Sequence, residues 1–371
     1  MRVIVVEPPS IRATDVLKGV AILLIMVHNF YHHLPPVMGE NEFSFQDGLF
    51  RQYVAFGIAN PEQVLRYSFS FFGHIGVQLF VFLTAYGYGM QSAKACGISI
   101  RYLLPRFLRV YVAFIVAVVL YLILLSAARI SGAGVQPLGA LDLFYRVTLV
   151  SNFVPYQALN VVGPWWYVSF LLQVMLVLPV IISAYASRGK VVAVLGIPLF
   201  VALEWAINPY LMKAGLNINQ TVFGFIPLLI FGVAFAHGDF RRVPVTVCLA
   251  LLLVLVASNF YYSAWLVYDI AFVIIVLVCW QLCSARIDVA QNKITRSLGY
   301  LGSISLYLFL VNGFLRFPFR RLSTAWDSPL LDLLLMVCFV LLSIAVGLLV
   351  MKGDALARRW LRWPVLQSTP R

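Results

Sequence analysis

Apolar runs separated by short polar or charged breaks follow one another along almost the whole chain. A run of about 20 apolar residues, folded as a helix, is long enough to cross the hydrocarbon core of a bilayer. The pattern therefore predicts an all-α fold, a polytopic integral membrane bundle formed as a single domain over residues 1–371. We expect about ten transmembrane helices, over residues 14–34, 69–91, 107–129, 164–186, 190–207, 220–237, 243–261, 263–284, 297–316 and 329–351.

The composition favours a membrane protein over a soluble one. Of the 371 residues, 62% are hydrophobic and 11% are charged, whereas about a quarter of the residues of a soluble domain are charged. The 18 prolines and 24 glycines fit this interpretation, because both residue types are tolerated in transmembrane helices. We therefore expect membrane lipids to contact the chain along most of its length.

The formal net charge of +13 raises the question of a nucleic-acid partner. The basic residues are spread between the apolar runs and form no groove with aromatic residues, so we expect no nucleic-acid binding. If the short N-terminal segment 1–13 is cytoplasmic, most lysines and arginines lie on the cytoplasmic side, including those of the basic C-terminal tail 352–371. This positive-inside pattern predicts two cytoplasmic termini and a multi-pass protein of the cell inner (plasma) membrane.

Lys18 and His28 lie inside the first predicted helix, where a charge is costly and usually functional. Lys18 and His28 are ten residues apart, or roughly 15 Å along a helix. Lys18 then lies near the cytoplasmic end, where it could simply extend to the lipid headgroups. His28 lies in the outer half of the membrane, where an imidazole needs a hydrogen-bonding partner or a functional role.

Acidic residues in later predicted helices map to the same outer half. Glu204, Asp269 and Asp332 lie at about the depth of His28 or nearer the surface. They suggest a polar cavity that opens outward, the alternative being ordinary acids at the membrane interface.

Three outer arginines, Arg316, Arg320 and Arg321, lie between the last two predicted helices and depart from the positive-inside pattern. They either bind an anionic group outside the membrane or contact lipid headgroups. We predict no metal site, because the pair Cys279 and Cys283 has no third ligand nearby.

Several motifs resemble those of the acyltransferase-3 superfamily, the bacterial membrane O-acyltransferases of surface polysaccharides. Asp15, Lys18 and His28 resemble the first helix of this family, which has Asp-x-x-Arg/Lys and then a histidine about three turns later. Nine residues separate Lys18 from His28, where the family usually has ten. The run Gly76–Gly87 is similar to the family's Gly-Val-x-Leu-Phe-Phe-x-Leu-Ser-Gly-Tyr/Phe signature.

The later motifs follow in the family's order and extend the resemblance over nearly the whole chain. Arg106 and Arg109 resemble a cytoplasmic Arg-x-x-Arg, and the run 166–179 resembles the family's Trp-x-x-Ser…Gln…Pro helix. The run 306–313 resembles the penultimate helix. The chain also departs from the family at several positions. It has Leu171 and Leu172 where the family often has Glu-Glu, Met175 in place of Tyr, Asn312 in place of a second His, and Thr84 and Ala85 in place of Ser-Gly.

The resemblance implies a membrane O-acyltransferase. Its donor is a cytoplasmic acyl-CoA, usually acetyl-CoA, which acts as a co-substrate, and no cofactor is bound permanently. Its acceptor is a hydroxyl of a cell-surface or lipid-linked glycan. We assign His28, Lys18 and Asp15 to catalysis, with His28 as the general base that accepts the proton of the sugar hydroxyl.

The other candidate residues divide between the two substrates. Arg106 and Arg109 are fork-shaped donors for the CoA phosphates, unless they serve only topology, and we group Gln78 and Tyr86 with them. The thioester oxygen needs a hydrogen-bond donor. Candidates for this role or for the acceptor are Trp166, Gln173, Asn312, Glu204, Asp269, Arg316 and Arg320.

Two other functions fit a bundle of this kind. The first is a polytopic transporter or flippase of a glycan or small molecule, for which ten helices and an outward cavity are equally suitable. The second is a catalytically inactive relative, which the departures at Leu171, Leu172 and Asn312 would suit. The Arg106 and Arg109 pair together with a single intramembrane His28 favours the enzyme.

Overall fold

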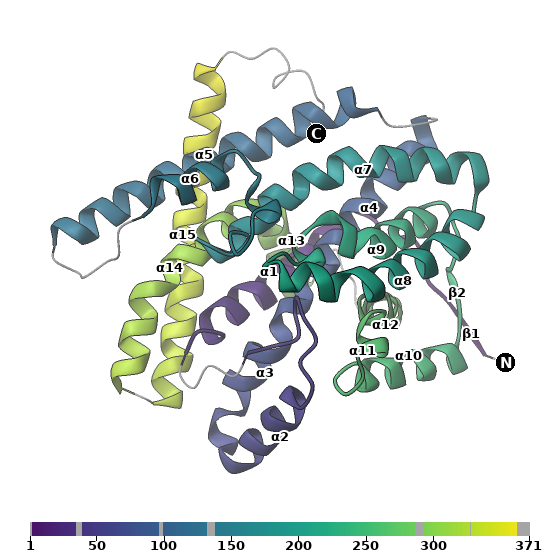
Figure 1. Cartoon of the computed structure of the whole chain (residues 1–371), viewed down its shortest axis with the longest axis horizontal. Helices are drawn as coiled ribbons and strands as arrows, with labels where there is room; N and C mark the ends of the chain where they lie inside the picture. The colour runs from purple at the N-terminus through teal and green to yellow at the C-terminus, as the bar shows by residue number, and fades with distance from the viewer. Residues whose placement is uncertain are drawn as a thin grey trace.

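The structure is a computed structural model that describes residues 2–34, 39–95, 99–131, 138–286, 292–326 and 328–361 (Figure 1). It confirms a predominantly helical fold, and every one of the ten predicted segments lies on helix. The α-helices are α1 Ile11–Tyr31, α2 Leu49–Ala59, α3 Val64–Phe72, α4 Gly76–Ala95, α5 Ile100–Ile130, α6 Ala140–Val147, α7 Trp166–Arg188, α8 Val191–Lys213, α9 Val222–Ala236, α10 Val245–Ala257, α11 Tyr262–Trp265, α12 Tyr268–Ser284, α13 Lys293–Ser303, α14 Ser305–Trp326 and α15 Pro329–Trp360.

Five helical segments in the described part of the chain are long and apolar enough to cross a membrane. They are Pro61–Ala93, Ile100–Ile130, Gly163–Arg188, Val191–Lys213 and Pro329–Trp360. The pair α13 and α14 makes a sixth if it is counted as one span, although its two helices meet at 76°. Helices α9, α10 and α12 are apolar but shorter. The chain is therefore a multi-pass membrane protein.

Three features differ from what was expected from the sequence. The predicted helix at 297–316 is broken near Ile304, between α13 and α14. The segment before α1 forms strand β1 (Val3–Val5), which pairs antiparallel with β2 (Arg242–Pro244), so that Val3 lies opposite Pro244. The predicted C-terminal tail 352–371 begins inside α15, which continues to Trp360, and residues 362–371 lie outside the described part of the chain.

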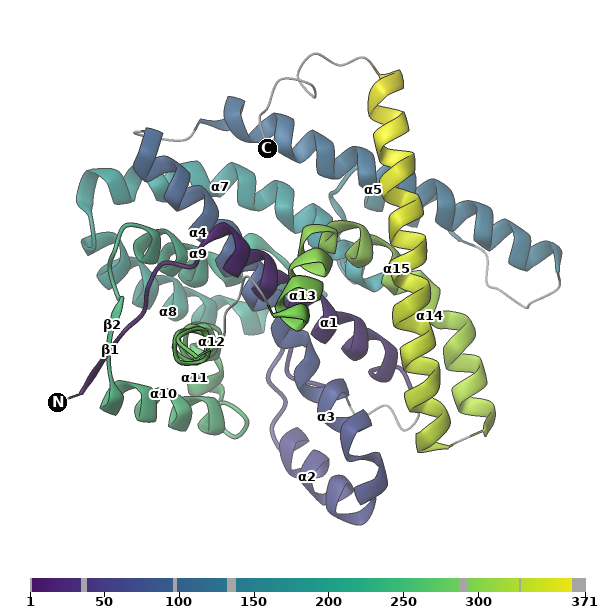
Figure 2. The ribbon, with the colours of Figure 1, turned by 180° about the vertical axis from the view of Figure 1, so that it is seen from behind.

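Residues 3–9 contact the second half of α4, the end of α12 and strand β2 at one end of the molecule. The hydroxyl of Tyr86, in the second half of α4, donates to the carbonyl oxygen of Pro9 at 3.0 Å. The backbone N–H of Glu7 donates to Gln281, near the end of α12, at 2.9 Å. We call this end, where β1 and β2 lie, the N-terminal face. Helices α2 and α3 project elsewhere, away from α5 and α7, in both views of the molecule (Figures 1 and 2).

Helix α1 is the central element, and glycines allow its neighbours to approach it closely. A Cβ atom added at Gly302 of α13 would lie 1.8 Å from the carbonyl oxygen of Asp15, so only glycine fits this crossing. A Cβ atom at Gly73 would lie 2.6 Å from the Cβ of His28. Small residues permit such close helix packing in membranes. These contacts fix Asp15 at one end of α1 and His28 at the other.

Candidate functional site

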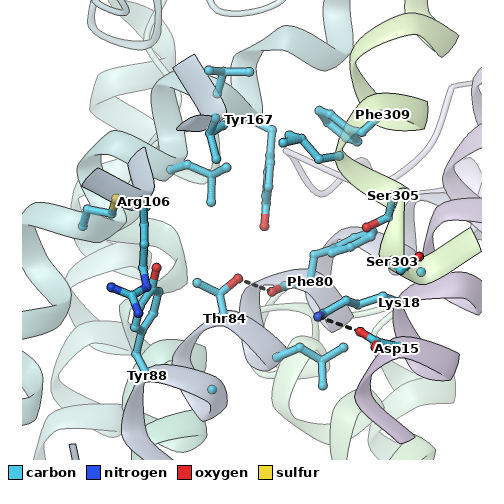
Figure 3. Close-up of a pocket in the computed structure, with 18 of the residues that line it drawn as sticks. Asp15, Lys18, Phe80, Thr84, Tyr88, Arg106, Tyr167, Ser303, Ser305 and Phe309 are labelled. Atoms are coloured by element: carbon cyan, nitrogen blue, oxygen red, sulfur yellow. Dashed lines mark hydrogen bonds and ion pairs between the residues drawn. The ribbon is translucent and has the colours of Figure 1, made fainter. Parts of the chain in front are cut away.

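A cavity of about 570 Å³ lies between α1, α4, α5, α7 and the break between α13 and α14 (Figure 3). We call it the main cavity. Its apolar wall includes Phe80 and Leu83 of α4 and Phe309 of α14. Its polar lining consists of Asp15, Lys18, Thr84, Gln91, Arg106, Tyr167, Ser303 and Ser305, with the hydroxyl of Tyr88 beside them. Most of these polar side chains come from helix turns near the N-terminal face.

Two of the predicted catalytic residues meet in this cavity. The Nζ atom of Lys18 donates to Oδ1 of Asp15 at 3.2 Å, one turn away on α1, and both side chains are about one-third exposed. The lining places this pair beside Ser303 and Ser305, at the break of the α13–α14 helix pair. Lys18 therefore faces a polar cavity inside the protein, as a functional residue would.

The two arginines of the Arg-x-x-Arg motif differ in their surroundings. Arg106 lines the main cavity and donates to the hydroxyl of Tyr102 at 2.5 Å, with its guanidinium carbon 3.6 Å from the centre of that ring. Arg109 is absent from the lining, but it lies close to Arg106 and to Arg358 of α15. Its Nε and Nη2 atoms are buried and make no hydrogen bond within the described residues. Together these side chains form a basic group at the edge of the cavity.

Tyr167 is a cavity residue that the sequence analysis did not select. Its ring is 7% exposed, and its hydroxyl points into the main cavity toward Thr84 (Figure 3). The hydroxyl of Thr84 donates to the carbonyl oxygen of Phe80 at 2.7 Å, so Thr84 still offers its lone pairs. Tyr167 directly follows Trp166 in the quoted motif, but a tyrosine inside an apolar run gives no distinct signal.

Four other predicted residues have structural partners away from the main cavity. Gln78 donates to the hydroxyl of Tyr268 at 2.5 Å, and Tyr86 is bonded to Pro9. The backbone N–H of Val222, at the start of α9, donates to Gln173 at 2.9 Å. The ring of Trp166 packs edge-on against that of Phe43, with the ring centroids 5.2 Å apart. The geometry therefore gives Gln78 and Tyr86 no contact with a ligand in that cavity.

His28 is the centre of a second polar site, near the opposite end of α1. It is 4% exposed, and its Nδ1 atom lies 3.2 Å from the carbonyl oxygen of Phe69. Its ring stacks on that of His32, with centroids 4.9 Å apart, and meets the ring of His74 edge-on at 5.8 Å. His33 is a further neighbour of His32, at 4.8 Å. We call these four residues the histidine cluster; the chain has five histidines in all.

An arginine and two asparagines lie against this cluster. The side chain of Asn29 donates to Oδ1 of Asn312 at 2.8 Å. Arg316 is 8% exposed and its Nη1 atom donates to Oδ1 of Asn29 at 3.3 Å, so it lies within the bundle and not among lipid headgroups. Arg316 and Arg320 are also charged neighbours of His33.

The three outer acids fall into two groups. Asp332 forms a buried ion pair with Arg66 of α3 at 3.3 Å and also accepts a hydrogen bond from Ser323. It is therefore a structural residue that links α3, α14 and α15, and the prediction that it faces an outward cavity with the other acids is wrong. Glu204 and Asp269 do lie near each other, in a polar region that also contains Tyr268. The ring of Tyr268 in turn faces His74, with centroids 6.5 Å apart.

One of three comparisons with known proteins finds a match, and this match covers most of the chain. A family model described as an acyltransferase domain, of the acyltransferase-3 type, matches residues 11–352. Neither the curated proteins nor the solved structures include a match to the chain. The matched range contains both the main cavity and the histidine cluster.

Proposed function

Because this chain belongs to the acyltransferase-3 family, an enzyme family that transfers acyl groups, we propose that it acylates a cell-surface or lipid-linked glycan. The donor is cytoplasmic acyl-CoA, with acetyl-CoA as the expected form, and the acceptor is a sugar hydroxyl. The observation that carries this proposal is the main cavity, about 570 Å³ in volume, with Arg106 and Lys18 in its wall. A transporter or an inactive relative has less support, since neither requires this combination.

The proposal places the N-terminal face in the cytoplasm and gives the chain ten membrane crossings. Residues 2–9, the start of α5 and the strand β2 then share the cytoplasmic side. The contacts of Tyr86 with Pro9 and of Glu7 with Gln281 support a common side for these segments. The charge distribution supports the choice of side, because the segments predicted to be cytoplasmic carry most of the basic residues.

The main cavity suits the donor in charge and in polarity. CoA carries several phosphate charges, and arginine guanidinium groups bind phosphate through paired hydrogen bonds. Arg106, with Arg109 beside it, supplies that charge at the cavity edge. Leu171 and Met175, which replace polar residues of the family, line the cavity and make its wall apolar. Such a wall accommodates the methylene groups of the pantetheine arm, while Tyr167 offers a hydrogen bond to its amides or its thioester.

His28 supplies the general base in this mechanism. If its Nδ1–H donates to the carbonyl oxygen of Phe69, the lone pair of Nε2 is free to accept the proton of the acceptor hydroxyl. The pantetheine arm has to extend along α1 from Lys18 to His28, roughly 15 Å. The acceptor then approaches the histidine cluster from the other side of the membrane, near Arg316 and Arg320.

The donor assignment is tested by acyl-CoA binding to the purified, detergent-solubilised protein. Charge reversal of both Arg106 and Arg109 to Glu should weaken binding by about tenfold or more, and the binding itself should weaken with salt because exposed charge pairs are screened. The control reverses Arg188, the last residue of α7, and Lys190, both of which are exposed basic residues. Equal binding in both double variants would show that Arg106 and Arg109 serve topology only.

A further inference from the structure

We propose that His28, His32 and Glu40 form a binding site for a divalent transition-metal ion of the Zn²⁺ type. One possible ligand atom of each residue lies within 4.8 Å of those of the other two. Within the described ranges, no other group of histidine, cysteine or carboxylate side chains comes together in this way. The binding itself is independent of the proposed function, whereas its effect on activity, given below, rests on that function.

The donor set is one that Zn²⁺ prefers. Imidazole nitrogen and carboxylate oxygen bind this ion at about 2.0–2.2 Å, and two histidines with one glutamate form a common three-residue set that leaves a fourth position open. His28 and His32 are four residues apart at the end of α1, so their rings lie on the same side of the helix. Ligands of one tetrahedral ion lie about 3.4 Å apart at such bond lengths. Small side-chain rotations are therefore needed to close the site, including a slight separation of His32 and Glu40, whose atoms are 2.6 Å apart.

Two of the possible ligand atoms already lie close together. Nδ1 of His32 and Oε2 of Glu40 are 2.6 Å apart, as in an ion pair when His32 is protonated, but the contact has no acceptable hydrogen-bond geometry within the described residues. With His32 neutral, both atoms can offer lone pairs to a shared cation. The carbonyl oxygen of Phe69 faces Nδ1 of His28, which is the usual second contact of a metal-bound histidine.

The glutamate is held in place by the loop that carries it. The indole N–H of Trp265 donates to the carbonyl oxygen of Asn41 at 2.7 Å, directly after Glu40. The side chain of Asn217 donates to the carbonyl oxygen of Phe43 at 2.9 Å. The loop is therefore anchored to the segment that follows α8 and to α11. Because the side chains of His32 and Glu40 are only 18% and 11% exposed, solvent has limited access to the ion.

A bound ion would change what His28 can do. The lone pair on Nε2 that accepts a proton in the proposed mechanism is the one that would bind the metal, since Nδ1 faces Phe69. The metal-loaded protein therefore has no free base at this position. We infer that Zn²⁺ inhibits acyl transfer reversibly, and that a chelator restores it.

Metal binding is measured first, without reference to activity. The full chain is purified in detergent, stripped with a chelator and dialysed against Zn²⁺, and bound zinc is quantified by elemental analysis and calorimetry. We expect one ion per chain, with His32→Gln and Glu40→Gln each lowering the affinity by about tenfold or more. The controls His237→Gln, outside the histidine cluster, and Glu62→Gln, an exposed carboxyl, should bind as the unmodified protein does. No bound zinc, or equal binding in all four variants, would overturn the site.

Spectroscopy of the unmodified protein keeps the proposal testable even if a variant fails to fold. X-ray absorption of the zinc-loaded chain should show nitrogen and oxygen ligands at about 2.0–2.1 Å with imidazole scattering. Sulfur ligands would instead indicate the cysteines and overturn the assignment. In the activity assay, inhibition that a chelator reverses supports competition with the base. Zinc binding without inhibition would retain the site but overturn this competition.

Discussion

The imidazole of His28 has no access to bulk water, yet it is surrounded by groups that can exchange protons or bind ions. Its neighbours His32 and His74 come from the end of α1 and from the turn before α4, and the carbonyl oxygen of Phe69 orients its ring. A buried imidazole with an oriented ring and a free nitrogen is suited to take a proton from a hydroxyl held nearby. Lys18, at the other end of the same helix, is suited to the opposite substrate, an anionic donor.

Replacement of His28 by Ala should reduce acyl transfer by at least about a hundredfold, because general bases typically contribute 10²–10⁴-fold to rate. Binding of acyl-CoA should be unchanged, since the main cavity does not include this residue. The measurement is transfer of labelled acetyl groups by the purified protein, with His237→Ala as the control. Activity of His28→Ala within a factor of about two of the unmodified protein would remove His28 from the role of base.

Asp332 is expected to affect stability and not the reaction. Its partner Arg66 is also buried, and removal of one member of a buried ion pair leaves the other charge unpaired, which costs about 3–5 kcal/mol. Asp332→Ala should therefore lower the Tm in detergent clearly, whereas Glu62→Ala at an exposed position should not. The transfer rate per folded molecule should be the same in both. A selective loss of acceptor affinity in Asp332→Ala would return this residue to the acceptor site.

The outer arginines can be tested by separating transfer from hydrolysis. Arg316→Gln and Arg320→Gln should reduce acyl transfer to a glycan acceptor, while hydrolysis of acyl-CoA by water continues. The reason is that arginines at this depth would bind a phosphate of the acceptor through bidentate hydrogen bonds. Because Arg316 also bonds to Asn29, Arg320→Gln alone is the cleaner variant. Equal loss of transfer and hydrolysis, or no loss of either, would contradict an acceptor site at these arginines.

At the scale of helices, the crossing of α1 and α13 brings two distant parts of the chain to one cavity. Asp15 and Lys18 lie on α1, and Ser303 and Ser305 flank the bend of 76° between α13 and α14. The bend turns α14 away from α13, so that Ser305 faces the cavity while the middle of α14 packs against α1. Glycine at position 302 is what allows the crossing.

A pair of matched substitutions in α13 tests this crossing. Gly302→Ala should lower both the Tm and acyl-CoA binding, because the added Cβ would lie 1.8 Å from the carbonyl oxygen of Asp15. Gly299→Ala, in the same helix, places its Cβ 3.8 Å from the side chain of Val16, which is ordinary contact. Since alanine favours a helix over glycine by about 1 kcal/mol, Gly299→Ala should be neutral or stabilising. The same effect from both substitutions would mean that the two helices pack less closely than described.

The helices were more predictable from sequence than their lengths and contacts. The structure has helix at each of the ten segments that were predicted from apolar runs of about 20 residues. Such runs are informative because hydrophobicity determines which stretches can enter a membrane. Hydrophobicity does not report a break inside such a run, and no proline or charge marks the bend near Ile304. Strand β1 was equally hidden, since three residues are too short to show alternation.

The site was predicted in part, for a similar reason. Asp15, Lys18, His28 and Arg106 were found because a charge or imidazole stands out against apolar neighbours. Their partners did not stand out: Glu40 lies in a polar loop, and Tyr167 lies in an aromatic-rich run.

At the scale of the whole molecule, the proposed function assigns the two polar sites to opposite faces of the membrane. The main cavity draws its charged lining from helix ends near the N-terminal face, whereas the histidine cluster lies at the far end of α1 beside α3, α14 and the loop that carries Glu40. In the proposed mechanism, a donor enters from one side and an acceptor from the other. The acyl group then crosses most of the membrane while it is still attached to its pantetheine arm.

The most direct test of this account is acyl transfer in proteoliposomes that contain the full chain in one known orientation. Labelled acetyl-CoA, which does not cross the bilayer unaided, is supplied either to the side that bears the N-terminal face or to the opposite side. The account predicts release of free CoA and loss of the acetyl label from the donor only in the first case, with the label appearing on a glycan acceptor across the membrane. Consumption of acetyl-CoA from the opposite side, or none from either side together with no CoA binding, would contradict it.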